Sequence, residues 1–217
     1  TTEIYTLSLT RRSSDLQGGP FEGESGMEKE SLRSAVALSH FFLRERVERG
    51  DRVVDATCGN GHDTLFLARL VGQEGKVWGF DLQEHALVKT RLLLDEAGCL
   101  AQTELISAGH ERLAEFISEP VAAVVFNLGY LPGGERRIIT RPEQTLAALD
   151  QAAHLLLPGG IITVCIYTGH PGGAEEGEAI ERWAAGLAPE AYNVWVSCPF
   201  NRPSSAPYVL LVEKVRT

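Results

Sequence analysis

Short hydrophobic runs alternate with longer segments of helical period along most of this chain. The runs are rich in Val, Ile and Phe, as is typical of strands that lie inside a sheet. The run at 121–126 is almost wholly apolar, which indicates a strand buried on both faces. We predict strands at the following positions: 52–56, 76–80, 103–107, 121–126, 161–167, 192–197 and 208–212.

Between these runs, apolar residues recur three and four positions apart, which predicts amphipathic helices. One helix is bounded at both ends, because Pro142 suits a first turn and Pro158-Gly159-Gly160 is a stop signal. Another helix precedes the first strand and ends at Gly50. Its apolar stripe consists of Leu32, Val36, Leu38, Phe41, Phe42 and Val47. The other helices are expected at 62–71, 84–97, 111–117, 142–157 and 176–187.

Strands that alternate with helix-length segments predict an α/β fold, with a mainly parallel sheet and helices on both faces. Ligands of such sheets bind beyond the carboxyl ends of the strands, where the strand order reverses. Residues 1–30 lack a sustained apolar period, so we expect a partly irregular extension there and the folded domain at 31–217. The candidate functional segments follow the strands: 55–63, 81–83, 108–110, 127–134 and 167–173.

The composition is that of a soluble globular protein with one core. The chain has 217 residues, of which 44% are hydrophobic and 23% charged, and this length suits one domain. Its apolar stretches are strand-sized and too short to cross a bilayer, so no membrane segment is expected. Residues 1–10 lack the apolar core of a secretory signal, which favours a cytoplasmic location.

Net charge and cysteine usage narrow the classes of partner. The net charge of −9 gives no support to a large basic face for nucleic acid, although a local basic patch fits within an acidic protein. The four cysteines form no Cys-x-x-Cys pair, and Cys58 with His62 lacks a second ligand pair. We therefore expect reduced thiols and no metal site.

The first strand leads into a glycine-containing loop, Asp55-Ala56-Thr57-Cys58-Gly59-Asn60-Gly61-His62-Asp63-Thr64. Gly59 and Gly61 allow a tight turn and a close approach of the backbone to a ligand. The helix that follows presents free N–H groups and a partial positive charge. Asp81 ends the second strand, where a carboxylate accepts hydrogen bonds from both hydroxyls of a ribose. These features together predict a site for an adenosine-bearing cofactor.

Two residues favour S-adenosylmethionine (SAM) over a dinucleotide. A dinucleotide loop usually has a third glycine or alanine where this loop has Thr64. Asp55 would repel a pyrophosphate, whereas it suits the ammonium group of a methionine moiety. Gln83 either reaches the ribose or is solvated, and His110 either contacts the adenine or starts a helix at the surface. Asp63 and Thr64 either belong to the cofactor site or only stabilise the first turn of the helix.

The fourth strand leads into Asn127-Leu128-Gly129-Tyr130-Leu131-Pro132-Gly133-Gly134, the candidate acceptor side. Asn127 and the carbonyl group of Leu128 are placed like the Asn-Pro-Pro-Tyr motif of amine-methylating enzymes, whose oxygens orient the acceptor nitrogen. Alignment of the reacting atoms then supplies most of the rate. His170 is a candidate base for the proton that the amine loses, and Tyr167 is a weaker candidate.

Candidate contacts to RNA follow on the same side. Tyr130 either stacks on a base or fills the wall of the pocket. Arg136, Arg137 and Arg141 form the densest basic cluster near the predicted cleft. They are either contacts to RNA phosphates or solvated charges on an exposed loop.

Three motifs carry a family resemblance: the segment from Asp55 to Thr64, the segment from Asn127 to Gly134, and Tyr167-Thr168-Gly169-His170. In this order they resemble small bacterial methyltransferases labelled rRNA methylases, a family now associated with tRNA wobble-uridine modification under the name MnmM. The resemblance covers about residue 31 to the C-terminus. It implies a seven-stranded, Rossmann-like class I methyltransferase fold and a homodimer. The implied reaction moves a methyl group from SAM to the amine of 5-aminomethyl-(2-thio)uridine at tRNA position 34, with S-adenosylhomocysteine (SAH) as product.

The resemblance also implies site residues by motif. Asn127, Tyr167 and His170 are expected to face the acceptor as catalytic residues. The residues expected to hold the cofactor by motif are Asp55, Thr57, Gly59, Asn60, Gly61, Asp81, Gln83 and His110. Asp63, Thr64 and Asn127 complete the predicted cofactor-binding set.

The sequence leaves three classes of function open. The first is the tRNA amine methyltransferase. The second is a methyltransferase of another RNA, such as rRNA, or of a small-molecule or protein amine, which the acidic net charge mildly favours. The third is a nicotinamide-dependent oxidoreductase or a non-catalytic nucleotide-binding module, against which Thr64 and the segment from Asn127 to Gly134 argue.

Overall fold

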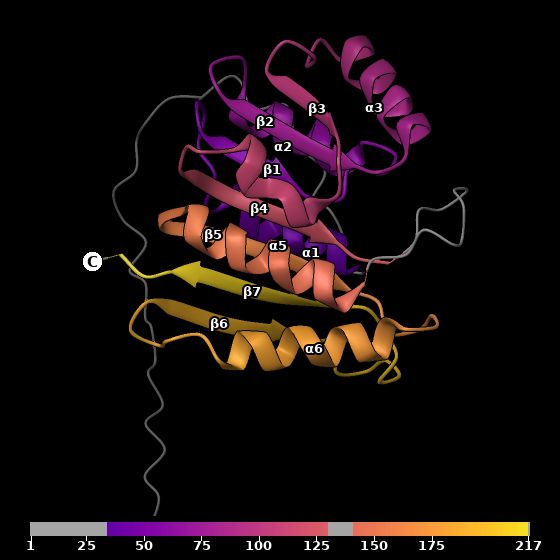
Figure 1. The fold of residues 1–217 in the computed structure, drawn as a ribbon, viewed down its shortest axis with the longest axis vertical. Coiled ribbons are helices and arrows are strands. Elements are labelled where there is room, and N and C mark those ends of the chain that lie inside the picture. Colours follow the sequence, from indigo (N-terminus) through magenta and orange to yellow (C-terminus); the bar gives the residue numbers. More distant parts are fainter. Residues whose placement is uncertain (1–33, 130–140, 217) are drawn as a thin grey trace, which may run out of the picture. The chain divides into compact units, whose positions relative to one another are not determined.

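The computed structural model describes residues 34–129 and 141–216. They form a seven-stranded sheet in the order β3-β2-β1-β4-β5-β7-β6 (Figure 1). β7 runs antiparallel to its neighbours β5 and β6, and the other neighbouring pairs are parallel. The prediction of a mainly parallel sheet is confirmed. The strands are β1 Arg52–Asp55, β2 Lys76–Asp81, β3 Thr103–Ser107, β4 Val121–Asn127, β5 Leu156–Ile166, β6 Tyr192–Ser197 and β7 Tyr208–Lys214.

Helices cover both faces of the sheet, as predicted (Figure 1). On one face, Leu67 and Ala68 pack with Val53 and Val77 of the first two strands. This layer consists of α1 Ala35–Arg44, α2 His62–Val71 and α3 Glu84–Glu96. On the other face, a separate apolar cluster joins Leu149 to the strands. That layer consists of the 3-10 turn η1 His110–Arg112, α4 Leu113–Phe116, α5 Pro142–Leu155 and α6 Gly173–Ala185.

The strand order reverses between β1 and β4. From β1 the chain proceeds outward to β2 and β3, and then returns to the other side of β1 as β4. The connections that leave the carboxyl ends of β1 and β4 therefore diverge to opposite faces of the sheet, which opens a crevice there. The glycine-containing loop and Asn127 lie at this crevice, because they follow or end these two strands.

The prediction for β5 was wrong at its start. The strand begins at Leu156, directly after α5, and includes the Pro158-Gly159-Gly160 segment that was expected to separate helix from strand. Its pairing with β4 shifts register between Val121 and Ala123, so the sheet absorbs the additional residues as a bulge. Gly159 has a φ of 82°, which glycine adopts without strain.

The prediction for α1 was also wrong in part. The helix ends at Arg44 and not at Gly50, and Phe41 of the expected apolar stripe is 46% exposed. The buried face carries small and polar residues instead, among them Ser39 and His40. Ser39 donates a hydrogen bond to Thr163 of β5 over 2.7 Å, because this helix lies close to the sheet. A purely apolar stripe therefore could not identify its buried side.

α6 begins at Gly173, before the expected residue 176, and the predicted extension at residues 1–30 lies outside the described residues. No helix within the described ranges is long and apolar enough to span a membrane.

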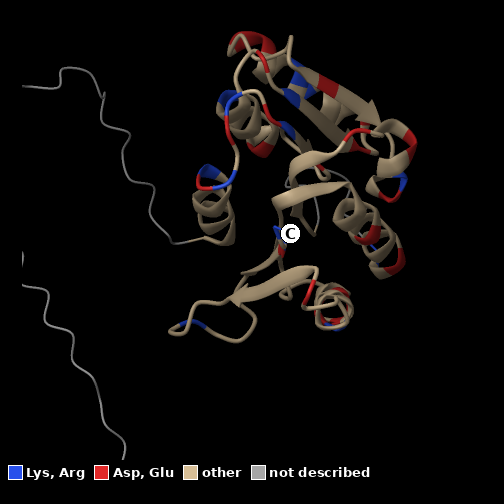
Figure 2. Ribbon diagram, turned by 90° about the vertical axis from the view of Figure 1, so that its left-hand side faces the viewer, with Lys and Arg blue, Asp and Glu red and all other residues tan. Residues whose placement is uncertain are grey.

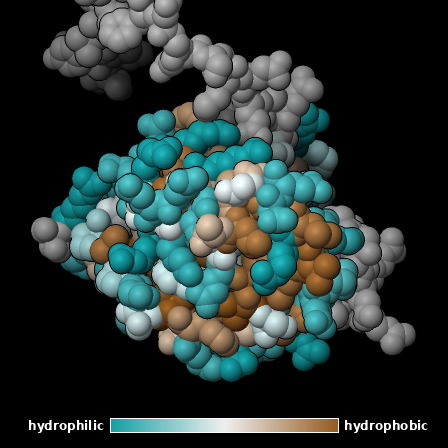
Figure 3. All heavy atoms as spheres, turned by 90° about the horizontal axis from the view of Figure 1, so that it is seen from above, coloured by the Kyte–Doolittle hydropathy of each residue, from teal (hydrophilic) through white to brown (hydrophobic). Residues whose placement is uncertain are grey.

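The surface is mixed in charge and carries some apolar patches. Figure 2 shows acidic and basic residues interspersed over the helices and strands in that view. Figure 3 shows hydrophobic residues gathered among hydrophilic ones on the side at which β3 and α3 lie in Figure 1. On α3, Val88 and Leu92 are more than half exposed, and on the opposite edge strand β6 the same holds for Trp195 and Val196.

Candidate active site

A cavity of about 380 Å³ opens at the carboxyl ends of β1, β2, β4 and β5. It is therefore at the place that the fold class predicts for a ligand. The structure brings the predicted residues of the loop, of β2 and of the acceptor side together around this one cavity. The predicted residues that line it are Thr57, Gly59, Asn60, Asp63, Asp81, Gln83, His110, Asn127, Tyr167 and His170.

Other predicted residues do not line this cavity. Asp55, Gly61 and Thr64 lie beneath the loop. Arg141 is exposed at the start of α5, outside the lining. The other proposed RNA contacts, Tyr130, Arg136 and Arg137, lie outside the described residues.

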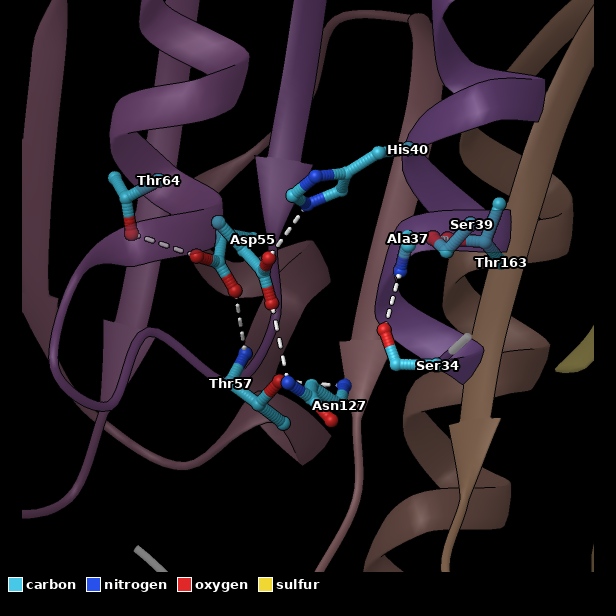
Figure 4. Close-up of polar contacts among 10 residues, drawn as sticks. Ser34, Ala37, Ser39, His40, Asp55, Thr57, Thr64, Asn127 and Thr163 are labelled. Carbon is cyan, nitrogen blue, oxygen red and sulfur yellow. Dashed lines mark hydrogen bonds and ion pairs between the residues drawn. The ribbon is translucent and has the colours of Figure 1, made fainter. Parts of the chain in front are cut away.

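Asp55 supports the loop from below, where a direct contact to the ligand had been expected. Its side chain is completely buried, and its two oxygens accept hydrogen bonds from the Thr57 N–H over 3.1 Å and the Thr64 hydroxyl over 2.6 Å (Figure 4). Burial and, to a smaller extent, the charge of the neighbouring Asp63 together raise the pKa of Asp55 to about 7. The sequence pattern placed the carboxylate in the right loop but could not show which way it points.

This raised pKa predicts a pH dependence of stability. Between pH 4 and 7 the folded chain keeps a proton on Asp55 that the unfolded chain, with an ordinary pKa of 3.8, releases. The free energy of unfolding therefore falls as pH rises through this window. We expect Asp55→Asn to remove a component on the order of 1–2 kcal/mol between pH 5 and 7, measured by urea unfolding. An unchanged pH slope, with Asp95→Asn on the surface of α3 as control, would contradict this.

Asp81 joins the end of β2 to the glycine loop. Its Oδ2 atom accepts a hydrogen bond from the Gly59 N–H over 2.8 Å, and its Oδ1 atom accepts one from the Gln83 N–H over 2.8 Å. Each carboxylate oxygen has a second lone pair for a ligand hydroxyl. Gln83 is 8% exposed, and its buried Oε1 atom has no hydrogen-bond partner among the described residues. This acceptor, at the wall of the cavity, fits a ligand that donates hydrogen bonds.

Glycine is needed at position 61 for packing against α3, and not for the predicted close approach to a ligand. The φ of Gly61 is 82°, and a Cβ atom there would lie 2.6 Å from the Thr90 hydroxyl of α3. Thr90 in turn donates a hydrogen bond to the Gly59 carbonyl over 3.2 Å. The glycine therefore lets α3 approach the loop from behind and hold it. No signal in the sequence identified Thr90, because its partner lies on a different element.

His110 forms a flat wall of the cavity after β3. The side chain is 8% exposed, and its ring meets Phe126 edge to face with centroids 5.8 Å apart. Burial lowers the pKa of His110, so the ring is neutral at physiological pH. A neutral aromatic ring suits the face or edge of a nucleobase.

On the acceptor side, Asn127 is held at two points. Its N–H donates to the Thr57 hydroxyl over 2.7 Å, and its amide nitrogen donates to Asp63 Oδ2 over 3.2 Å. Since a carboxylate only accepts, the amide nitrogen must face Asp63. The orientation of the Asn127 amide therefore follows from chemistry, and its oxygen is the atom left for a ligand (Figure 4).

Tyr167 and His170 line the same end of the cavity as Gly129. His170 Nδ1 lies 3.1 Å from the Pro171 carbonyl, which accepts only, so Nδ1 carries the proton of the neutral ring. Nε2 of that ring then has the lone pair of a base. Burial raises the pKa of Tyr167 to about 12, so its hydroxyl keeps its proton at neutral pH. Of the two predicted bases, the geometry favours His170.

Comparisons with known proteins place the chain in a family. The family model described as "Putative rRNA methylase" matches residues 77–213. A relative from Arabidopsis thaliana, named tRNA (mnm(5)s(2)U34)-methyltransferase, chloroplastic, is 38% identical over 84% of this chain and 70% of its own length. The chain belongs to this methylase family.

Solved structures agree with the methylase fold. A Clostridium thermocellum protein with the same description as the family has a TM-score of 0.83 and 42% identity, over 86% of the methylase and all of that chain. A Streptococcus mutans protein described as a methyltransferase, solved in complex with SAH, has a TM-score of 0.77 and 34% identity, over 85% of the methylase and all of that chain. The methylase is therefore a SAM-dependent methyltransferase with a Rossmann-like fold, and the resemblance inferred from three motifs is confirmed.

One residue beside the site, His40, was not predicted from the sequence. His40 of α1 lies with its Nε2 atom 2.7 Å from Asp63 Oδ1, and both side chains are largely buried. The sequence carried a signal, since His40 is a polar residue within a predicted apolar helix, but its partner could not be inferred. Cys58 lines the cavity, and burial raises the pKa of its thiol to about 12, which argues against a nucleophilic thiolate. Within the described residues no group of three or more His, Cys, Asp or Glu could hold a metal ion.

Proposed function

We propose that the methylase transfers the methyl group of SAM to the amine of 5-aminomethyl-(2-thio)uridine at position 34 of tRNA. The observation that carries this proposal is the 38% identity, over 84% of the chain, to a protein named for the mnm(5)s(2)U34 position of tRNA. An alignment over 84% of the chain includes both the glycine-containing loop and the acceptor side of the site. The geometry of Asn127 supports an amine acceptor, because its amide oxygen is oriented to accept from N–H groups.

The cavity supports a specific placement of SAM. Asp81 and the unpaired Gln83 oxygen suit the ribose hydroxyls, and His110 suits the adenine. The methionine end would then lie along the loop, where Asp63 would supply a negative charge for the ammonium group. The proposed neighbours of this end are Thr57, Gly59, Asn60 and Asp63. Asp55, Gly61 and Thr64 act by shaping the loop from beneath.

The residues on the acceptor side have different roles in the proposed reaction. Bound SAM supplies an electrophilic methyl group on a sulfonium, whose C–S bond breaks with the electron pair going to sulfur as the amine nitrogen forms the new C–N bond. Asn127 Oδ1 and the Leu128 carbonyl orient the amine, so that its lone pair is aligned with the methyl group. His170 Nε2 takes the proton that the nitrogen must lose, and Tyr167 borders the pocket as a neutral hydroxyl.

The proposed contacts to tRNA come from the segment between β4 and α5. Tyr130, Arg136 and Arg137, which lie outside the described residues, and the exposed Arg141 are proposed to meet the nucleoside and its phosphates. They follow β4 in the sequence, between the end of that strand at Asn127 and the start of α5 at Pro142. A small local patch of this kind is compatible with a net charge of −9, because only the phosphates near the anticodon need be met.

Homodimerisation and a cytoplasmic location complete the proposal. β6 is an edge strand with Trp195 69% exposed, and Phe200 beyond it is fully exposed. Exposed aromatic groups of this size on a sheet edge are typical of an interface, and we assign the contact between two copies to this edge. Light scattering of the purified chain measures its molar mass, and the mass of two chains is expected.

The buried thiols Cys58, Cys99 and Cys165 suit a reducing compartment such as the cytoplasm.

The test of the proposed function is nucleoside mass spectrometry of tRNA. A strain that lacks this methylase should accumulate 5-aminomethyl-(2-thio)uridine, and the purified protein with SAM should convert that nucleoside in the isolated tRNA to its N-methyl form. tRNA from the parent strain serves as control, since its amine is already methylated. Unchanged tRNA in both experiments would contradict the proposal and favour rRNA, a small molecule or a protein amine as acceptor.

A further inference from the structure

A chain of polar contacts connects α1 to the acceptor side of the cavity. His40 Nε2 lies 2.7 Å from Asp63 Oδ1, and Asp63 Oδ2 accepts from the Asn127 amide nitrogen over 3.2 Å. The three residues come from α1, from the first turn of α2 and from the end of β4. His40 itself does not line the cavity and lies outside the segment 77–213 that the family model matches.

The histidine is held in place by neighbours in α1 and α2. Its ring stacks on Phe66 of α2, with centroids 3.8 Å apart and planes within 5° of each other. The preceding residue, Ser39, anchors α1 to Thr163 of β5 through a buried hydrogen bond of 2.7 Å (Figure 4). His40 is 8% exposed. The ring therefore has one position, from which it holds one oxygen of Asp63.

The orientation of Asn127 depends on that hold. An asparagine amide has a donating and an accepting end of nearly equal shape, so a half-turn exchanges them at little steric cost. Asp63 selects one orientation, because a carboxylate accepts from the nitrogen and repels the oxygen. With one oxygen of Asp63 bound to His40, the other is directed at Asn127, and the Asn127 oxygen faces the cavity.

We infer that His40 is a positioning residue for the acceptor amine: it holds Asp63 so that Asn127 presents its oxygen to the incoming nitrogen. The inference rests on the proposed function, in which the acceptor is an amine. Without His40, the Asp63 carboxylate stays beside the loop, but its Oδ2 atom is no longer fixed toward Asn127, and the Asn127 amide samples both orientations. In the wrong one, the NH2 group points at the amine, where it repels the N–H groups and competes for the lone pair needed for attack.

The kinetic test measures single-turnover methyl transfer to tRNA that carries 5-aminomethyl-(2-thio)uridine. It compares His40→Leu, His40→Gln and the control Ser39→Ala. His40→Leu fills the same space without a donor, and we expect a fall in the methyl-transfer rate of about 10–100-fold. The dissociation constant for SAH should change by less than about 3-fold, because the charge of Asp63 remains. His40→Gln should restore the rate to within about 3-fold of wild type, since its amide nitrogen takes the place of Nε2.

Ser39→Ala is the matched control for the docking of α1. It removes the hydrogen bond to Thr163 but leaves His40 stacked on Phe66 and in contact with Asp63, so it should lower the midpoint of urea unfolding with an unchanged rate. Should His40→Leu fail to fold, His40→Asn replaces it, because the shorter side chain does not reach Asp63. A rate equal to wild type in the donor-free variant, or a loss of SAH affinity as large as the loss of rate, would overturn the inference.

A second readout needs no RNA and separates the inference from the proposed function. The side-chain amide of Asn127 gives two signals in a 1H–15N NMR spectrum, assigned by their absence in Asn127→Ala. We expect shifted, slowly exchanging signals in wild type and His40→Gln, and broadened signals with faster solvent exchange in His40→Leu. Identical signals in all three proteins would refute the inference that His40 positions the Asn127 amide. A protein that shows the expected signals but methylates no tRNA would refute the proposed function alone.

Discussion

Replacing Asp81 with alanine is expected to raise the dissociation constant for SAH by about 100-fold, or about 2.7 kcal/mol. The carboxylate makes two kinds of contact that disappear together. It accepts hydrogen bonds from the backbone of Gly59 and Gln83, so its loss leaves two N–H groups without their partner and loosens the loop. It also provides the acceptors that we assign to the ribose hydroxyls. Isothermal calorimetry with SAH measures the change.

Asp95→Ala is the control for this experiment, because Asp95 is an exposed carboxylate on α3 away from the cavity. Its affinity for SAH should equal that of wild type. The affinity of Asp81→Asn for SAH should lie between those of wild type and Asp81→Ala, since one of the two carboxylate oxygens is replaced by a donor. An Asp81→Ala protein that is folded and binds SAH within about 3-fold of wild type would show that the ribose lies elsewhere.

The Asn127→Ala variant should lose about 100–1,000-fold in the rate of methyl transfer, with SAH affinity nearly unchanged. In the proposed reaction, the amide oxygen of Asn127 orients the amine only when the acceptor is bound, so its removal should act on the reaction and not on the binding of the donor. Rapid-quench measurement with saturating SAM gives the rate, and calorimetry gives the affinity.

Gln73→Ala provides an amide deletion in the turn between α2 and β2, at the other end of the sheet, and should leave both quantities unchanged. Equal losses of rate and SAH affinity in Asn127→Ala would contradict an acceptor role. They would instead make Asn127 part of the cofactor site alone.

The sequence predicted the central part of the fold well because hydrophobic period reports burial directly. The strand at 121–126 and the helix at His62–Val71 lie within a residue or so of their predicted bounds, since each has one uninterrupted pattern. The start of β5 could not be predicted in this way. Pro158 and Gly159 read as a break, and only the register shift against β4 shows that the sheet accepts them.

The candidate site was predictable as a place but not as a set of contacts. Parallel strands bring their carboxyl ends to one edge, so residues after β1, β2 and β4 had to meet. Which way a side chain points depends on partners from other elements. Asp55 turns inward because Thr57 and Thr64 satisfy its oxygens, and His40 reaches Asp63 only because α1 lies close to the sheet.

A crystal structure of the whole chain with SAH tests the central claim most directly. We expect the ribose hydroxyls within hydrogen-bond distance of Asp81, the adenine beside His110, and the sulfur atom facing the oxygen of Asn127. A nucleoside bound outside this cavity, or one whose sulfur points away from Asn127, would contradict the account of both the cofactor site and the acceptor side.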